Sequence, residues 1–351
     1  MRQVAIIGAG IGREHLAAYL QLPHLFNVSI MCDLDTARAA EAIGAATDIE
    51  ISGDVEAVFA NPDIDIIDIC LPPHLHVPMA LQALAAGKDV ICEKPLACSL
   101  ADIDVLQEAL KTSKGSLLPV FQYRYGKGVD QLKALIDAGL AGRPFIASAE
   151  THWDRDDAYY AVPWRGTFDG EAGGALLGHA IHAHDIICHI LGPVAEVSAY
   201  TDTRVNDIEV EDCAAINMMM ENGALVTSSV TLGAADNMSR FRFCFSGLTA
   251  ESGTAPYSPA QDSWVFTPRG ATKQSDIDAV LDKIDTLHSG FTGFLEAASQ
   301  TLSDNTHPVI SFADGQRSIE LVTACYQSHQ LRKSVKLPLS KEDSFYQGWR
   351  S

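Results

Sequence analysis

The first 120 residues alternate short apolar runs with segments of helical periodicity, and this alternation restricts the fold more than any other feature. The run QVAII precedes the helical pattern REHLAAYLQL, and NVSIM precedes DTARAAEAI. The alternation continues through IDIIDICL, HVPMALQALAAG, DVICE, SLADIDVLQEALKTS and LLPVF. Strands that alternate with helices of this length predict an α/β domain, in which helices cover both faces of a parallel sheet.

Glycines fill the turn between the first apolar run and the first helix, in the pattern Gly-x-Gly-x-Gly. Gly8 is expected to form the tight turn, and Gly10 to let a pyrophosphate approach the helix N-terminus. Gly12 stands one position earlier than the third glycine of the usual fingerprint. Asp33 closes the second apolar run, where a carboxylate accepts hydrogen bonds from the adenosine ribose. This context predicts a dinucleotide site for NAD, and the nearby Arg38 keeps NADP as an alternative cofactor.

Size and charge bound the remaining possibilities. A chain of 351 residues, 47% of them hydrophobic, is long enough for two cores. The formal net charge of -20 argues against nucleic acid and anionic membranes as partners. The eight cysteines include no Cys-x-x-Cys pair, which favours reduced core cysteines in a cytoplasmic protein. No apolar run has the length of a membrane span.

The second half of the chain has a different pattern. Beyond a boundary near residue 121, strand-like runs follow one another: FIASAETHW, VAEVSAYTDTR, VEDCAAINMMM, ALVTSSVTL, RFRFCFS and SWVFT. The sequence Glu221-Asn222-Gly223 between two of them is a hairpin signal. We therefore expect a Rossmann domain over residues 1–121 and a substrate-binding and oligomerisation domain over 122–351, built on a mostly antiparallel sheet.

One predicted helix, GGALLGHAIHAHDIICHILG, carries a cluster of four histidines: His179, His182, His184 and His189. Helical spacing puts His182 and His189 along one edge with Asp185, whereas His184 points elsewhere. A metal site would use His179, His182 and a carboxylate, but it lacks the His-Glu-x-x-His spacing and a second ligand cluster. We expect no metal here and core positions for His184 and His189.

Five segments in chain order resemble the Gfo/Idh/MocA family of oxidoreductases, which includes glucose-fructose oxidoreductase and inositol dehydrogenase. They are GAGIGREH with its trailing His15, LPPHLHVPMALQALAAGKDVICEKPLA, WRGTFDGEAGGALLGHAIHAHD, VEDCAAINMMMENGALVT and NTHPVISFADGQRSIELVTACYQSH. The resemblance spans nearly the whole chain. It implies a Rossmann domain followed by an α+β domain with a large open sheet, through which a homodimer or homotetramer would assemble.

The resemblance also implies a proton-transfer pair, Lys94 of the Glu-Lys-Pro motif and His182 of the later helix. The family commonly reads Asp-x-Gly-x-His-x-x-Asp along that helix. This chain has Gly178 and Ala180 at the first two of those positions, so the first carboxylate is missing. His179 neighbours the gap, and we expect it to replace part of the hydrogen bonding of the missing carboxylate.

The motifs and their family counterparts together give the expected site. Cofactor contacts are expected from Gly8, Gly10, Ile11, Gly12, Asp33, Leu71, Pro72, His76, Glu93, Lys94 and Arg165. Substrate contacts are expected from Arg124, His152, Trp164, His179 and Asp185. Aromatic faces and forked guanidinium donors suit a polyhydroxylated ring.

These expectations favour an NAD(P)-dependent oxidoreductase that acts on a secondary alcohol of a sugar, sugar acid or cyclitol. A second interpretation is an enzyme that oxidises its substrate transiently and then eliminates or hydrolyses a glycosidic substituent. A third is a nucleotide-sensing regulator without catalytic activity. Net production of NADH separates the first interpretation from the second.

Overall fold

The computed structural model describes residues 1–46, 48–284, 288–304 and 309–350, and it divides the chain into two compact units. Unit 1 comprises Met1–Val120 and Phe291–Ile319, and unit 2 comprises Phe121–Gly290 and Glu320–Ser351. The change at 120/121 coincides with the expected boundary. The segment Phe291–Ile319 differs from the expected division, because it returns to unit 1, where Phe291 packs on His15. The first residues of the segment NTHPVIS, 305–308, lie outside the described residues.

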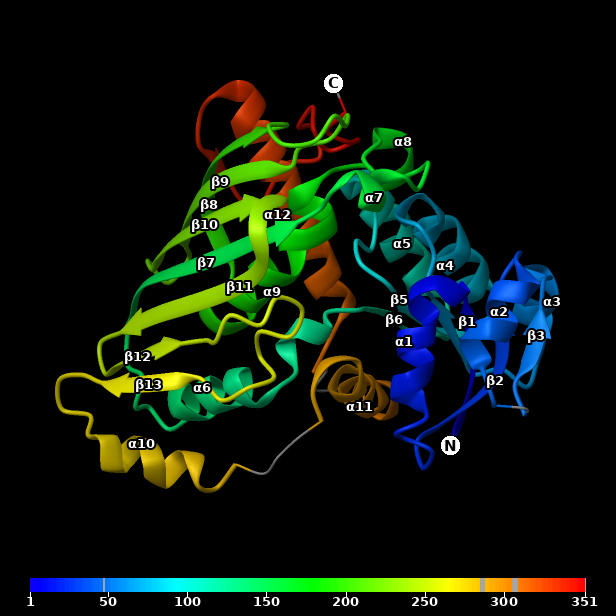
Figure 1. Cartoon of the computed structure of the whole chain (residues 1–351), viewed down its shortest axis with the longest axis horizontal. Coiled ribbons are helices and arrows are strands. Elements are labelled where there is room, and N and C mark those ends of the chain that lie inside the picture. The colour runs from blue at the N-terminus through cyan, green and yellow to red at the C-terminus, as the bar shows by residue number, and fades with distance from the viewer. Residues whose placement is uncertain (47, 285–287, 305–308, 351) are drawn as a thin grey trace. The chain divides into compact units, whose positions relative to one another are not determined.

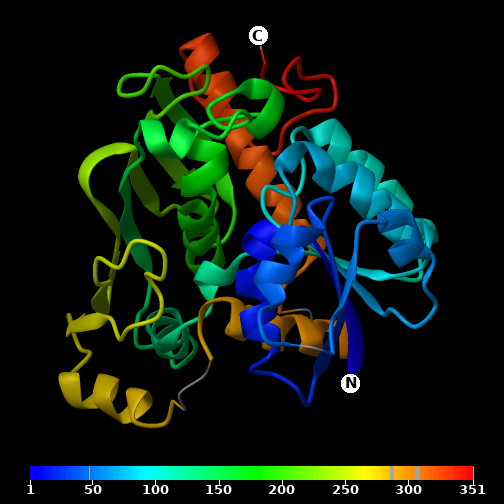
Figure 2. The same ribbon diagram turned by 45° about the vertical axis from the view of Figure 1, so that its right-hand side comes forward.

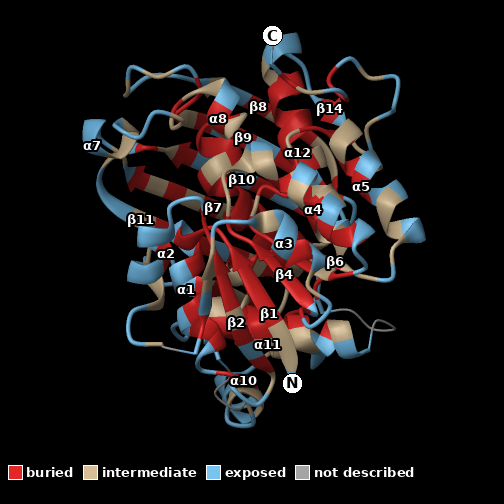
Figure 3. Ribbon diagram, turned by 90° about the vertical axis from the view of Figure 1, so that its right-hand side faces the viewer, coloured by how far each residue is buried: buried red, intermediate tan, exposed pale blue. Residues whose placement is uncertain are grey.

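Unit 1 is built on a parallel six-stranded sheet in the order β3-β2-β1-β4-β5-β6, which confirms the predicted Rossmann arrangement. The strands are β1 (Arg2–Ile7), β2 (Phe26–Cys32), β3 (Glu50–Ser52), β4 (Ile66–Ile69), β5 (Asp89–Cys92) and β6 (Leu117–Pro119). Figure 3 shows β1, β2 and β4 as a buried centre. Every residue of β4 is buried, as a strand between two helical layers requires.

Helices flank this sheet (Figure 1). They are α1 (Ala9–Tyr19), α2 (Thr36–Ile43), α3 (Val55–Ala60), α4 (His76–Ala85), α5 (Leu100–Thr112) and α11 (Gly290–Ser303), with a 3-10 turn η1 (Pro73–Leu75). Helix α1 begins at Ala9, four residues before the predicted helical pattern, so Gly10 and Gly12 belong to its first turn. At Gly12 a Cβ would lie 2.8 Å from Ile6 Cγ2, so the glycine allows α1 to pack closely on β1.

Unit 2 is built on an eight-stranded sheet in the order β13-β12-β11-β7-β10-β9-β8-β14. Its strands are β7 (Pro144–Asp154), β8 (Val194–Asp202), β9 (Cys213–Met220), β10 (Leu225–Thr231), β11 (Gly233–Phe245), β12 (Leu248–Glu251), β13 (Val265–Pro268) and β14 (Val335–Lys336). Only the β7–β10 pair of this sheet is parallel among the described residues, which confirms the mostly antiparallel prediction. The predicted hairpin joins β9 to β10, with Gly223 at φ 84°.

The remaining helical segments belong to unit 2 or end in it. They are η2 (Gln122–Arg124), α6 (Lys127–Asp137), α7 (Asp157–Tyr160), α8 (Phe168–Glu171), a π-helical turn η3 (Leu176–Ala180), α9 (Ile181–Leu191), α10 (Gln274–Leu281) and α12 (Phe312–Leu331). Helix α9 runs along one face of the sheet (Figures 1 and 2), where His184 Nε2 lies 3.1 Å from Ser228 Oγ of β10. Across the described parts of the chain, no helix is both long and apolar enough to span a bilayer.

Candidate active site

The turn between β1 and α1 has the backbone geometry that a dinucleotide site needs. Gly8 adopts φ 102°, and a Cβ there would lie 2.3 Å from the carbonyl oxygen of Cys70. A side chain at this position is therefore excluded by both strain and contact. Gly10 has no atom within 4 Å of its missing Cβ, so the backbone of the first helical turn is open to a close approach. These residues fit a pyrophosphate at the N-terminus of α1.

Asp33 lies directly after β2, at the same edge of the sheet. Its Oδ2 accepts the N–H of Ala9 at 2.8 Å, which joins the end of β2 to the start of α1. Arg38 donates to both carboxylate oxygens at 2.7 and 2.9 Å, and the N–H of Asp35 donates to Oδ1. Burial alone would raise the pKa of Asp33, but these hydrogen bonds lower it below its ordinary value. Asp33 is therefore ionised and already shares its charge with Arg38.

Lys94 follows β5 at this carboxyl edge, as predicted, and its backbone is held by the preceding residue. The Lys94 N–H donates to Glu93 Oε2 at 3.0 Å, and the other oxygen of Glu93 lies 3.1 Å from His15 Nε2. His15 Nδ1 in turn lies 2.9 Å from Asp68 Oδ2. His15 and Asp68 are both fully buried. Sequence reasoning had missed Asp68, whose signal is an acidic residue inside an all-apolar strand.

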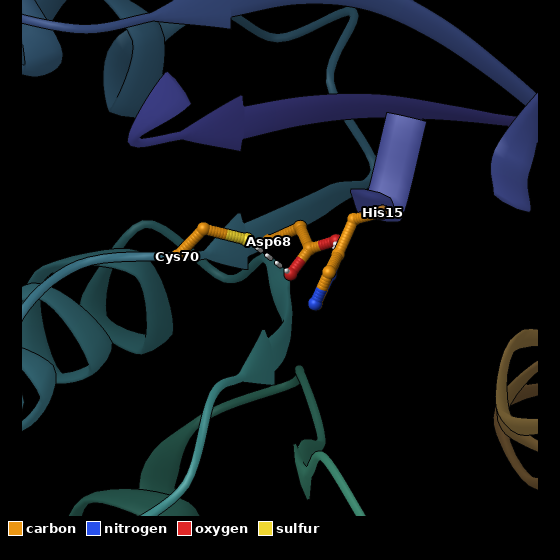
Figure 4. Close-up of side chains that lie close together, drawn as sticks. All are labelled: His15, Asp68 and Cys70. Atoms are coloured by element: carbon orange, nitrogen blue, oxygen red, sulfur yellow. Dashed lines mark hydrogen bonds and ion pairs between the residues drawn. The ribbon is translucent and has the colours of Figure 1, made fainter. Parts of the chain in front are cut away.

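His15, Asp68 and Cys70 also form a group of metal-ligand atoms within 4.8 Å of one another, which the sequence had not grouped. In Figure 4 the imidazole of His15 and the thiol of Cys70 are both directed at the carboxylate of Asp68. Burial, followed by the charge of Asp68, raises the pKa of the Cys70 thiol to about 12, which disfavours the thiolate that metals bind. Hydrogen bonding accounts for the geometry of this group.

His76 links the turn after β4 to the Glu-Lys-Pro segment. Its two ring nitrogens each lie 2.7 Å from a carbonyl oxygen, that of Pro95 and that of Leu71. Burial outweighs both contacts and lowers the pKa of His76. Leu71 and Pro72 are half-buried at the end of β4, and Ile11 is 41% exposed in the first turn of α1. Their contacts with a cofactor stay a prediction.

In unit 2, a buried carboxylate fixes the start of the helix that carries the histidines. Glu211 accepts the N–H of Gly174 at 3.0 Å and that of Leu176 at 2.9 Å, and the Tyr326 hydroxyl donates to both of its oxygens. Burial raises the pKa of Glu211 to about 7 despite these donors. The π-helical turn η3 follows at once, and such turns often occur at functional sites.

His182 lies in the first turn of α9 and is 4% exposed. Its ring stacks on Tyr123 of η2, with centroids 4.3 Å apart and planes 17° from parallel. One helical turn further, Asp185 forms a bidentate ion pair with Arg124, also of η2, with both contacts at 2.5 Å. The ring stack and the ion pair thus tie the same two elements together and fix the His182 imidazole. The side chains of Arg124 and Asp185 are each 2% exposed, and their expected contact with substrate stays a prediction.

His179 lies at the centre of an aromatic cluster of unit 2. The Tyr159 hydroxyl is 3.3 Å from His179 Nε2, and the Trp153 ring meets the imidazole edge-on at 5.3 Å between centroids. The Arg165 guanidinium stacks 3.9 Å above the Tyr159 ring and 5.0 Å from the Trp164 ring. Three of the expected residues, His179, Trp164 and Arg165, therefore belong to one cluster, and Tyr159 completes it.

Two further histidines of unit 2, His152 and His184, lie apart from this cluster, and His189 is half-buried near the end of α9 rather than in the core as expected. His152 points to the open face of the sheet, where its Nε2 lies 2.9 Å from Ser229 Oγ, because side chains alternate along β7 and its neighbour Trp153 takes the covered face. His152 is thus separated from His179. His184 is buried against Ser228, and burial lowers its pKa to about 4, which fits the expected core position.

Comparison with known proteins agrees with this fold and these motifs. Residues 2–120 match the model of the oxidoreductase family with an NAD-binding Rossmann fold, and residues 129–251 match that of the GFO/IDH/MocA C-terminal domain. Levoglucosan dehydrogenase of Pseudarthrobacter phenanthrenivorans is 30% identical over 210 residues, which cover 57% of this chain and 54% of that protein. D-apiose dehydrogenase of Rhizobium rhizogenes is 26% identical over 88% of this chain and 90% of that protein.

Among solved structures, the WlbA dehydrogenase from Bordetella pertussis in complex with NADH and UDP-GlcNAcA has a TM-score of 0.83. It is 25% identical, and the match covers 96% of this chain and 99% of that one. With the first four curated relatives, the match spans between 54% and 65% of their length. The two family models together account for more than half of the chain, in the expected order, and the chain belongs to the Gfo/Idh/MocA family.

Proposed function

We propose that this protein is an NAD-dependent dehydrogenase or reductase that acts on a secondary alcohol, or the matching ketone, of a sugar, sugar acid or cyclitol. The observation that carries this proposal is the carboxyl edge of the unit 1 sheet. The open backbone at Gly10, the ionised Asp33 and Lys94 all follow strands that end at this edge. In an open α/β sheet, this edge is where ligands bind.

The cofactor would be held at the N-terminus of α1 and by Asp33, with further contacts from the residues expected above. When bound, nicotinamide supplies the acceptor for the hydride of the carbinol carbon. Lys94 Nζ, in its neutral form, takes the proton that leaves the substrate hydroxyl. His182, fixed by Tyr123, donates or accepts the second hydrogen bond at that hydroxyl. Because Lys94 and His182 belong to different units, their approach to one substrate is part of the proposal.

The substrate class is supported by the His179 cluster and by the relatives. Tyr159 and Trp164 offer aromatic faces beside the Arg165 guanidinium, a combination that suits a ring with many hydroxyls. The curated relatives include dehydrogenases of levoglucosan and D-apiose. The expected homo-oligomer and cytoplasmic location stay part of the proposal.

The test is a panel of D-glucose, D-gluconate, D-glucuronate and myo-inositol with NAD and NADP, followed at the absorbance band of reduced nicotinamide. Lys94→Met keeps the length of the side chain without its amine and is expected to lower kcat by about 10²- to 10⁴-fold. The control is Lys111→Met on α5, where the lysine is exposed and pairs with Glu108. Equal turnover by Lys94→Met and the wild type would exclude the proposed role of Lys94. Cofactor binding without turnover by the wild type would favour the regulator.

A second activity is favoured by one observation, the missing carboxylate at Gly178. A Cβ there would meet no atom within 4 Å, so crowding at that atom does not account for the glycine. Consumption of a glycoside without net NADH would identify this cycling activity.

A further inference from the structure

Three elements of unit 1 contribute a buried row of ionisable side chains in direct contact. His15 comes from α1, Asp68 from β4, and Glu93 directly follows β5. The imidazole lies between the two carboxylates, with Nδ1 2.9 Å from Asp68 and Nε2 3.1 Å from Glu93. His15 and Asp68 are 0% exposed and Glu93 is 6% exposed. Three buried ionisable side chains in direct contact are costly to bury, which calls for a physical reason.

The geometry fixes the charge of the ring. Both nitrogens face carboxylate oxygens, so an imidazolium can donate to both. Their negative charge stabilises the charged ring, which the neutral carbonyls around His76 do not do. Burial is the largest single influence and would lower the pKa of His15, but the charge of Asp68, its hydrogen bond and the smaller effects of Cys70 together raise the pKa well above its ordinary value. Burial likewise opposes ionisation of Glu93, yet the hydrogen bond from His15 lowers its pKa. The histidine therefore stays charged through the neutral range, and its stabilising effect is lost only when the pH rises through its elevated pKa.

The other titratable groups near the ring in the described part of the chain are weak acids held neutral by burial. The Cys70 thiol and the Tyr19 hydroxyl lie near Asp68, and burial raises the pKa of both, so that both are neutral. On the other side the ring packs against Phe291 of α11, with centroids 4.5 Å apart. At the Glu93 end of this group, the charges of Lys94 and His76 also lower the pKa of Glu93. The ring is therefore held as a buried cation between these groups.

The link to Lys94 runs through the second oxygen of Glu93. Oε1 of Glu93 faces His15, and Oε2 accepts the backbone N–H of Lys94 at 3.0 Å. We propose that His15 is a positioning residue for Lys94: as a buried cation clamped to Asp68, it holds Glu93 in the one orientation that also fixes the Lys94 backbone. This inference rests on the proposed function, because it concerns the lysine that takes the substrate proton.

The charge state is tested without any activity measurement. Side-chain 15N spectra of the wild-type protein are recorded over the neutral range, and the His15 signals are assigned by their loss in His15→Gln. Both ring nitrogens are expected to remain protonated throughout. A ring that titrates with the ordinary histidine pKa of about 6.5 would overturn the inference.

The positioning role is tested by two variants. His15→Gln removes the cation, and Glu93→Asp keeps the charge but is one methylene too short to reach both His15 and the Lys94 N–H. Each is expected to lower kcat by about 10²-fold, with KM for the substrate and Kd for NADH changed far less. If His15→Gln does not fold, Glu93→Asp carries the test alone. Wild-type kcat in folded Glu93→Asp would overturn the inference.

The matched control breaks an ion pair at the opposite end of the same strand. Asp89, the first residue of β5, pairs with Arg2 at 2.5 Å. Asp89→Asn is expected to lower the unfolding temperature and leave kcat unchanged. A drop in kcat equal to that of Glu93→Asp would show that any loss of stability in unit 1 slows turnover, which contradicts a positioning role.

A pH profile adds a readout that a purely structural role would not move. Glu93→Gln removes the negative charge beside Lys94, which lowers the pKa of the ammonium. The acid limb of log kcat for alcohol oxidation is then expected to move to lower pH, and an unmoved limb would count against the inference. Failure of the proposed function is seen separately, as wild-type turnover in Lys94→Met. If Lys94→Met is inactive and His15→Gln is fully active, the positioning role of His15 is refuted and the proposed function is not.

Discussion

At the end of β2, the Asp33–Arg38 ion pair is expected to influence the choice between NAD and NADP. A free carboxylate repels a 2′-phosphate, but Arg38 covers Asp33 from 2.7 and 2.9 Å while its own side chain stays 55% exposed. The guanidinium can therefore turn outward to a phosphate. Asp33→Ser is expected to raise kcat/KM for NADP relative to NAD, and Arg38→Ala to lower it, each by about tenfold.

Initial rates with both cofactors measure this ratio. Arg13→Ala is the control, since Arg13 is 69% exposed on α1 and pairs with its neighbour Glu14. A ratio that moves equally in Arg13→Ala would mean that general surface charge, rather than the Asp33–Arg38 pair, selects the cofactor.

His179 is expected to supply part of the hydrogen bonding that a carboxylate at Gly178 gives in related chains. Its Nε2 is oriented by the Tyr159 hydroxyl at 3.3 Å. His179→Ala is then expected to lower kcat/KM by about tenfold, the value of one hydrogen bond of about 1.4 kcal/mol. Gly178→Asp added to that variant is expected to restore part of the loss, because the position has room for a side chain. Unchanged turnover in His179→Ala would remove His179 from the site.

Residues at strand ends were predictable from the sequence, and residues that depend on distant partners were not. Asp33 and Lys94 could be placed because each follows an apolar run, and the carboxyl ends of parallel strands share one edge. The partners of His15 could not be placed, since Asp68 and Glu93 are 53 and 78 residues away in the chain. The same applies to Tyr159, whose contact with His179 joins a short helix to a π-helical turn.

At the scale of elements, the start of the histidine-bearing helix depends on Glu211. Its pKa of about 7 in the folded protein lies above the ordinary glutamate value of about 4.3. The folded state therefore holds this proton more tightly than the unfolded chain. The resulting stabilisation, on the order of 3 kcal/mol, is complete at low pH and is lost as the pH rises through about 7.

Tyr326→Phe exposes this dependence by removing the hydroxyl that donates to both oxygens of Glu211. Above pH 7 the carboxylate is charged, and loss of the donor is expected to cost about 2 kcal/mol. At about pH 5.5 the carboxyl is protonated, and the cost is expected to fall to about 1 kcal/mol. Urea unfolding at the two pH values measures both costs. Tyr200→Phe, on the open face of the sheet, is the control. An equal cost at both pH values would contradict the elevated pKa.

The type of each element was easier to predict than its limits. Alternating and periodic patterns identified every strand of unit 1 except the three-residue β3, which has too few residues to show a period. The start of α1 was predicted too late, because glycines in a first turn look like a loop. The π-helical turn at Leu176–Ala180 leaves no mark in the sequence, since it depends on the anchor that Glu211 provides from another element.

At the scale of the whole molecule, the return of Phe291–Ile319 to unit 1 could not be foreseen. Helix α11 is as amphipathic as a helix of unit 2 would be, and only its contacts assign it. Phe294 and Leu295 bury fully, and the carbonyl of Leu302 accepts from Arg2 of β1. A domain boundary can be read from the sequence where the pattern of strands and helices changes. The sequence pattern does not change where the later segment returns to unit 1.

We expect self-association through the open face of the unit 2 sheet. Ile146, Leu225 and Met219 are direct neighbours across β7, β10 and β9, and they are 46%, 53% and 43% exposed. A row of exposed apolar side chains on a sheet is typically buried in an interface with a partner. We expect the wild type to be a homodimer or homotetramer through this face.

Leu225→Glu places a charge at the centre of that row, and burying a charge against an apolar partner is costly. Light scattering after size exclusion is therefore expected to show a smaller assembly for Leu225→Glu than for the wild type, at equal concentration. Val105→Glu, at a 49% exposed position on α5 of unit 1, should keep the wild-type mass, since it adds the same charge elsewhere. A monomeric wild type, or an unchanged mass for Leu225→Glu, would assign this face to something other than a second copy of the chain.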